Sequence, residues 1–146
     1  MTLPSRKKLP HEIPSWVRDD AVFFISINCA ERGENQLCHE SIAKVVADAF
    51  RFRHERGEWH VHLLLLMPDH LHALLAFNHA HEMKHLIAKT KEFISRHTGI
   101  RWQRDYFDHR LRNDESHVEK AHYVRMNPVR KGLVARPEDW PYVWDS

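Results

Sequence analysis

Residues 63–77, LLLLMPDHLHALLAF, constrain the fold more than any other stretch of the chain. Two apolar runs of strand length flank a short polar insert that begins with a Pro-Asp pair, which is typical of a turn. We therefore predict two neighbouring strands joined as a hairpin. Because side chains alternate along a strand, His70 and His72 would lie on one face of the sheet and Leu71 on the other. The two imidazoles are either half of a metal site or two half-exposed strand residues.

The remaining segments alternate between strand and helix patterns. Strands are predicted over 21–30, 58–69 and 70–77, a fourth strand or extended segment over 100–111, and helices over 37–57, 82–99 and 116–126. Pro128 would kink or end the last helix. The order β-α-β-β-α-β-α predicts an α+β fold, a ferredoxin-like split β-α-β antiparallel sheet with an added C-terminal helix. We expect one domain over 1–146, with a basic N-terminal arm (1–20) and a C-terminal tail (133–146).

The composition is that of an ordinary globular protein, and it predicts a cytoplasmic location. The longest apolar run, 63–67, has the length of a strand and not of a membrane span. No apolar segment follows the charges of the N-terminal arm, as it would in a secretory signal. Cys29 and Cys38 make neither a disulfide framework nor a paired zinc motif, and no role follows for them.

Basic residues are concentrated in two parts of the chain, although the formal net charge is only +2. The segment 120–136 contains five basic residues and no acidic one, and the N-terminal arm adds Arg6, Lys7 and Lys8. Basic blocks interleaved with aromatic side chains favour phosphate backbones and unstacked bases. The alternative is a solvated face that keeps the protein soluble.

The last predicted helix carries a second pair of candidate residues. Tyr123 and Asn127 are four residues apart, so they would lie one above the other on one helical face. A tyrosine oxygen is a nucleophile, but its usual pKa near 10 means that it needs a positioned electrophile or a metal at neutral pH. An asparagine offers a neutral carbonyl oxygen that suits Mg²⁺ or Mn²⁺. If this helix packs on the sheet face of His70 and His72, the four groups converge.

Taken together, these motifs resemble a known family. MPDHLHAL, followed by HYVRMNPVRKGLV, resembles the single-tyrosine HUH transposases of the IS200-like superfamily, and most closely their REP-associated tyrosine transposases. WQRDYFDHRLR before the tyrosine, DWPY near the end and RKKLPHEIP near the start match that branch too. The resemblance covers nearly the whole chain, and the motifs occur in the expected order.

The resemblance implies roles for individual residues. His70 and His72 match the two metal-binding histidines, Tyr123 the catalytic nucleophile, and Asn127 the third metal ligand. Many insertion-sequence relatives have Gln at that last position. His109 lies in an FDHR motif that recurs in the family, and the sequence indicates no role for it. The implied cofactor is Mg²⁺ or Mn²⁺. Candidate DNA contacts are Arg6, Lys7, Lys8, Arg112, Arg125, Arg130, Lys131, Trp140 and Tyr142.

The implied activity is that of a DNA nicking and strand-transfer enzyme, acting on single-stranded DNA hairpins such as REP-like palindromes through a 5′-phosphotyrosine intermediate. It would work without a membrane, either alone or as a homodimer. Two alternatives remain open: a non-catalytic hairpin-binding regulatory module, and a metal-dependent hydrolase that activates water at His70 and His72. Trp140, Tyr142 and Trp144 either cover the sheet or contact DNA, and the sequence favours neither interpretation over the other.

Overall fold

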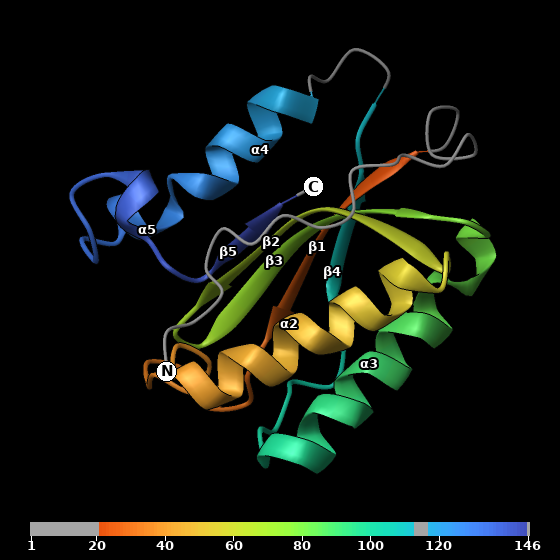
Figure 1. Cartoon of the computed structure of the whole chain (residues 1–146), viewed down its shortest axis with the longest axis horizontal. Coiled ribbons are helices and arrows are strands. Elements are labelled where there is room, and N and C mark those ends of the chain that lie inside the picture. The colour runs from red at the N-terminus through yellow and green to blue at the C-terminus, as the bar shows by residue number, and fades with distance from the viewer. Residues whose placement is uncertain (1–20, 113–116, 146) are drawn as a thin grey trace.

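The computed structural model describes residues 21–112 and 117–145, and within them the chain forms a five-stranded antiparallel sheet (Figure 1). The strands are β1 (Val22–Asn28), β2 (Trp59–Met67), β3 (His70–Phe77), β4 (Phe107–Arg110) and β5 (Val143–Asp145). The helices are α2 (Glu40–Glu55), α3 (Met83–Thr98), α4 (His117–Arg125) and α5 (Asn127–Arg130), with short 3-10 turns η1 (Ala80–Glu82) and η2 (Pro137–Asp139). The strand order β4-β1-β3-β2-β5 contains the split β-α-β arrangement and confirms the predicted α+β fold.

The hairpin predicted around residues 63–77 is formed by β2 and β3. Their register starts at Met67 opposite His70 beside the turn and runs to Trp59 opposite Phe77. On its other side β3 pairs with β1, so the strand that carries the histidines lies in the middle of the sheet. A central strand is held by hydrogen bonds on both edges, which makes its side-chain positions rigid.

The two faces of the sheet are covered by different helices (Figure 1). Helices α2 and α3 cover one face, and their apolar stripes pack on Leu71, Ala73 and Leu75 of β3. Helices α4 and α5 lie over the other face, where a second, smaller core contains Leu74 of β3 and Val124 of α4. The alternation of β3 therefore turns its histidines toward the α4 side.

The C-terminal tail differs from the prediction, because it adds an edge strand. β5 pairs with β2, and Trp144 is buried in the larger core with 2% of its surface exposed. Trp140 is 7% exposed, and its indole N–H donates to the Leu66 carbonyl at 2.9 Å. These positions support the interpretation in which the two tryptophans cover the sheet. A strand of only three residues carries too little alternation to be recognised in the sequence.

None of the helices in residues 21–112 and 117–145 has the length and apolar character that a membrane span requires.

Candidate functional site

The two histidines of β3 lie side by side at the start of the strand, as the alternation predicts. The ring centroids of His70 and His72 are 4.8 Å apart, and their planes are 77° from parallel. His72 also stacks on Phe24 of β1, with ring centroids 5.3 Å apart. The strand period therefore places both rings on one face, and the stacking on Phe24 fixes His72 within the sheet itself.

Each imidazole is hydrogen-bonded through Nδ1. His70 Nδ1 lies 2.7 Å from Asp69 Oδ1, and His72 Nδ1 lies 2.7 Å from Ser26 Oγ. Ser26 is opposite His72 in the β1–β3 register, so the sheet supplies this partner directly. With the proton on Nδ1, each ring keeps Nε2 as its acceptor. Histidine metal ligands show this arrangement, because the outer hydrogen bond sets the tautomer and the ring orientation.

The electrostatics keep both imidazoles in the neutral form that binds metals. Burial lowers the pKa of His72 to about 3, and the nearby His70 and Lys120 add to the shift. Burial also lowers the pKa of His70, against the opposing effect of Asp69. For Asp69, burial favours the neutral acid, but hydrogen bonds from the Gly33 N–H and from His70 outweigh it, and the pKa is lowered.

The candidate nucleophile faces the same side of the sheet. Tyr123 lies on α4 and 55% of its surface is exposed. It opens onto a cavity of about 370 Å³ between α4, α5, β1, β3 and β4. The cavity is lined by Phe24, Ser26, His72, Phe107, His109, Lys120, Tyr123 and Asn127. Residues distant in the sequence, His72, Tyr123 and Asn127, thus share one cavity, and His70 adjoins it through His72.

Two cations approach the Tyr123 ring. Lys120 Nζ is 5.0 Å from the ring centroid of Tyr123 and 4.2 Å from that of Phe24, and Arg130 Cζ is 4.1 Å from the Tyr123 centroid. Such cation–π contacts bring positive charge to the cavity that Lys120 and Tyr123 line. Lys120 was not among the residues predicted for the site, although its spacing three before Tyr123 places it on the same helical face.

Tyr123 and Asn127 do not lie on one continuous helix. α4 ends at Arg125, α5 begins at Asn127, and Met126 forms the turn between them. The prediction of one helix through both residues is therefore wrong, although both side chains line the same cavity. The prediction that Pro128 kinks or ends the helix agrees with the break, since Pro128 lies in the first turn of α5. Proline has no N–H to continue the helical ladder, which is the physical reason for the break.

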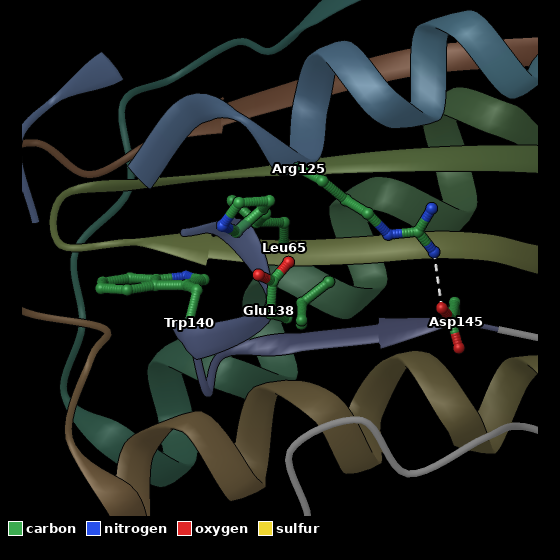
Figure 2. Close-up of a pocket in the computed structure, with 7 residues that line it drawn as sticks. Leu65, Arg125, Glu138, Trp140 and Asp145 are labelled. Atoms are coloured by element: carbon green, nitrogen blue, oxygen red, sulfur yellow. Dashed lines mark hydrogen bonds and ion pairs between the residues drawn. The ribbon is translucent and has the colours of Figure 1, made fainter. Parts of the chain in front are cut away.

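The candidate DNA contacts fall into different places. Arg6, Lys7 and Lys8 lie outside the described residues, while Arg112 and Lys131 are exposed. Tyr142 is half-buried, with its ring 5.3 Å from that of Trp140. Arg125 points into a second cavity of about 300 Å³, where it pairs with Asp145 at 2.5 Å (Figure 2). That cavity is lined by Leu65, Arg125, Pro137, Glu138, Trp140, Val143 and Asp145. Arg125 and Trp140 are thus apart from the Tyr123 cavity.

The donor set fits a divalent metal only if Asn127 is included. No three His, Cys, Asp or Glu side chains of the described chain form a metal-binding group. His70 and His72 supply two neutral nitrogens, and Asn127, which lines the same cavity as His72, adds a carbonyl oxygen. Two nitrogens and one oxygen, with room for water or phosphate oxygens, suit Mn²⁺ better than Mg²⁺, which favours oxygen ligands.

Comparisons with known proteins agree with the resemblance seen in the sequence. A candidate REP-associated tyrosine transposase of Haemophilus influenzae is 31% identical over 91 residues, which are 57% of this chain and 51% of that protein. The REP-associated tyrosine transposase of Escherichia coli K12 is 21% identical over 129 residues, or 82% of this chain and 73% of that protein. The chain thus spans about half the length of the first relative and about three quarters of the second. No protein-family model matches the chain.

Solved structures share the fold. The structure of a REP-associated tyrosine transposase bound to a REP hairpin superposes with a TM-score of 0.75 at 19% identity, over 92% of this chain and 82% of that one. A candidate transposase from Deinococcus radiodurans gives a TM-score of 0.54 at 15% identity, over 79% and 92% of the two chains. The chain is thus similar in sequence to two REP-associated tyrosine transposases, and it shares the fold of a third that was solved with a REP hairpin.

Proposed function

We propose that the chain is a metal-dependent enzyme that nicks and rejoins single-stranded DNA at palindromic hairpins, through a 5′-phosphotyrosine intermediate. The observation that carries this proposal is the shared cavity of His72, Tyr123 and Asn127. A tyrosine that served only to pack would not need to open onto two candidate metal ligands. Its similarity to REP-associated tyrosine transposases, one of them solved with a REP hairpin, supports DNA hairpins as the substrate class.

The metal would be held by Nε2 of His70, Nε2 of His72 and Oδ1 of Asn127. When bound, a divalent cation there supplies a Lewis acid that offsets the charge of the scissile phosphate. The roles of Asp69 and Ser26 follow from their hydrogen bonds at Nδ1, which present the opposite nitrogen of each ring. We expect Mn²⁺ to support activity at least as well as Mg²⁺, because imidazole is a poor ligand for Mg²⁺.

Tyr123 would perform the covalent step. Its Oη forms a bond to the phosphorus, the bond between phosphorus and the 3′ oxygen breaks, and the phenol proton is lost as the departing oxygen gains one. The products are a 5′-phosphotyrosine and a free 3′-OH. Because the phosphotyrosine conserves the energy of the phosphodiester, a 3′-OH can attack it and restore a DNA strand. Water as the nucleophile would lose that energy.

The basic surroundings would bring the phosphate to the tyrosine. Lys120 and Arg130 lie within cation–π distance of its ring, and the FDHR strand β4 forms one wall of the cavity through Phe107 and His109. Stacking and phosphate contacts are the means by which a small domain holds single-stranded DNA. The exposed ring of Phe107 at the cavity offers a surface for an unpaired base, whereas the ring of Phe24 is covered by His72 and Lys120.

The test is a denaturing gel of the protein with end-labelled hairpin oligonucleotides and Mn²⁺, comparing wild type with Tyr123→Phe. The oligonucleotides should carry palindromes with single-stranded flanks. We expect a slow-migrating, protease-sensitive adduct with the wild type and none with Tyr123→Phe. Cleavage by both proteins without an adduct would indicate a metal-dependent hydrolase instead. Hairpin binding without cleavage would indicate a regulatory module.

A further inference from the structure

The break between α4 and α5 raises the question of what fixes Asn127 relative to Tyr123. In one continuous helix the backbone ladder would set the distance between the two side chains. Here Met126 lies in a turn and Pro128, just after Asn127, donates no hydrogen bond. Backbone hydrogen bonds still reach Met126 from both sides, from its N–H to the His122 carbonyl at 3.1 Å and from the Arg130 N–H to the Met126 carbonyl at 2.9 Å. Side-chain contacts at Tyr123 and Asn127 would add to this partial ladder in relating the candidate nucleophile to the candidate metal ligand.

Arg130 supplies contacts across this break. Its Nη2 donates to the main-chain carbonyl of Tyr123 at 2.8 Å and to Oδ1 of Asn127 at 2.9 Å. Its guanidinium carbon lies 4.1 Å from the centroid of the Tyr123 ring. A single side chain thus contacts the backbone and ring of the nucleophile and the ligand oxygen of the asparagine.

We propose that Arg130 is a positioning residue that holds Tyr123 and Asn127 in one fixed arrangement. This inference rests on the proposed function and deepens it. The sequence placed Arg130 among residues that contact DNA, whereas its contacts in the structure are with the site itself. A carbonyl oxygen has two lone pairs, so Oδ1 can accept from Arg130 and still offer a lone pair to a cation.

The geometry of arginine suits this role better than that of lysine. The guanidinium is planar, it carries several donors in a rigid fork, and it stacks on aromatic rings. An ammonium group would keep the positive charge, but it would not reproduce both the stacking and the two hydrogen bonds. Lys120 offers an internal contrast, because its contacts are with the rings of Tyr123 and Phe24. Positive charge near the tyrosine and support of Asn127 can therefore be tested separately.

The experiment compares Arg130→Met, Arg130→Lys, Lys120→Met, Asn127→Ala and the double variant Arg130→Met with Asn127→Ala. Arg96→Met, in an exposed ion pair on α3, is the control for loss of one positive charge. The first readout is the single-turnover rate of adduct formation with Mn²⁺, alongside hairpin affinity. The second is the side-chain amide signal of Asn127 in NMR spectra of the metal-free protein, assigned with Asn127→Ala. Thermal melting confirms that each variant is folded.

We expect Arg130→Met to slow adduct formation by about 10- to 100-fold, since misplacing reacting groups by about 1 Å costs that much. Arg130→Lys should restore little of the rate, and Asn127→Ala should add little to Arg130→Met, because both act on one arrangement. The Asn127 amide signal should shift in both Arg130 variants and stay in place in Lys120→Met and Arg96→Met.

Three results would overturn the inference: an Arg130→Met rate equal to that of Arg96→Met, full rescue by lysine, or an unshifted Asn127 amide. The inference would also be overturned if the rate reduction of the double variant equalled the product of the reductions in Arg130→Met and Asn127→Ala, because the two residues would then act independently. Absence of any adduct in the wild type would instead reject the proposed function. In that case the amide signal of the metal-free protein still decides whether Arg130 holds Asn127.

Discussion

Strands β2 and β3 each carry two histidines separated by one apolar residue, His60-Val61-His62 and His70-Leu71-His72. The strands are neighbours in the sheet, and a bulge at Val61 and Leu63 interrupts their register. In both pairs burial lowers the pKa, to about 4 for His60 and about 3 for His62. By residue type, spacing and charge state, the two pairs are equivalent candidates for a metal site.

Their surroundings differ. The β2 pair packs ring against ring with other histidines: centroid distances are 4.7 Å from His54 to His60, 4.6 Å from His60 to His62 and 4.4 Å from His62 to His117. Nε2 of His62 is buried without a hydrogen-bond partner among the residues that the structure describes. The β3 pair has oxygen partners at both Nδ1 atoms and shares its cavity with a tyrosine. An H-x-H stretch becomes a candidate site through these outer partners, and the stretch alone does not distinguish the two pairs.

The largest expected effect separates the two histidine pairs directly. His72→Ala should reduce Mn²⁺-dependent adduct formation by at least about 100-fold, because it removes one of the proposed metal ligands. His62→Ala, in the equivalent position of the other pair, should change the rate by less than about threefold, since it lies outside the cavity. Both rates are measured in single-turnover reactions after melting curves confirm folding. Equal losses in the two variants would remove the distinction.

A smaller effect tests the outer hydrogen bonds. Ser26→Ala removes the partner of His72 Nδ1 and leaves both imidazoles in place. Loss of such a partner typically weakens metal affinity by about 10- to 100-fold, and we expect that range for Mn²⁺ measured by electron paramagnetic resonance. Ser41→Ala, which removes an exposed hydroxyl from α2, is the matched control. Unchanged Mn²⁺ affinity in Ser26→Ala would mean that the hydroxyl does not orient the ring.

The smallest effect concerns stability and the histidines of β2. A folded-state pKa below the unfolded value means that the unfolded chain binds more protons, so acid lowers the free energy of unfolding. The stability that the neutral His62 imidazole contributes to the free energy of unfolding is fully present above pH 6.5. It is lost as the pH falls from 6.5 toward about 3. Within that window, each such imidazole lowers the free energy of unfolding by at most about 1.4 kcal/mol for every pH unit of acidification.

Urea unfolding at pH 7 and pH 5 measures this dependence. The wild type should be less stable at pH 5, and His62→Leu should reduce the difference between the two values. A variant with the same difference as the wild type would show that His62 does not titrate on unfolding. In that case the β2 pair, His60 and His62, would not be the acid-sensitive part of the fold.

Much of the fold follows from local patterns. Two apolar runs on either side of the Pro-Asp turn define the hairpin, and helical spacing defines α2 and α3, which Gly57 and Gly99 follow. The position of His70 and His72 on one face follows from the strand period alone. Gly99 has a φ of 79°, a left-handed conformation that glycine adopts without strain, and so it marks the end of α3.

Other features depend on tertiary contacts and leave little trace in the sequence. β5 gains its structure from pairing with β2 and burial of Trp144, because a three-residue strand has no pattern of its own. The contacts of Arg130 with Tyr123 and Asn127 depend on the shape of the α4–α5 break. The sequence also did not distinguish the β3 pair from the β2 pair by any local signal, since their partners come from other elements.

The central claim is that Tyr123 becomes joined to DNA beside the β3 histidines. The most direct measurement is mass spectrometry of the protein–DNA adduct after nuclease and protease digestion, which identifies the modified tyrosine among the three in the chain, Tyr106, Tyr123 and Tyr142. The account predicts a phosphonucleotide on the peptide that contains Tyr123, formed only when Mn²⁺ or Mg²⁺ is present. A phosphonucleotide on Tyr106 or Tyr142, or DNA cleavage that leaves every tyrosine unmodified, would contradict it.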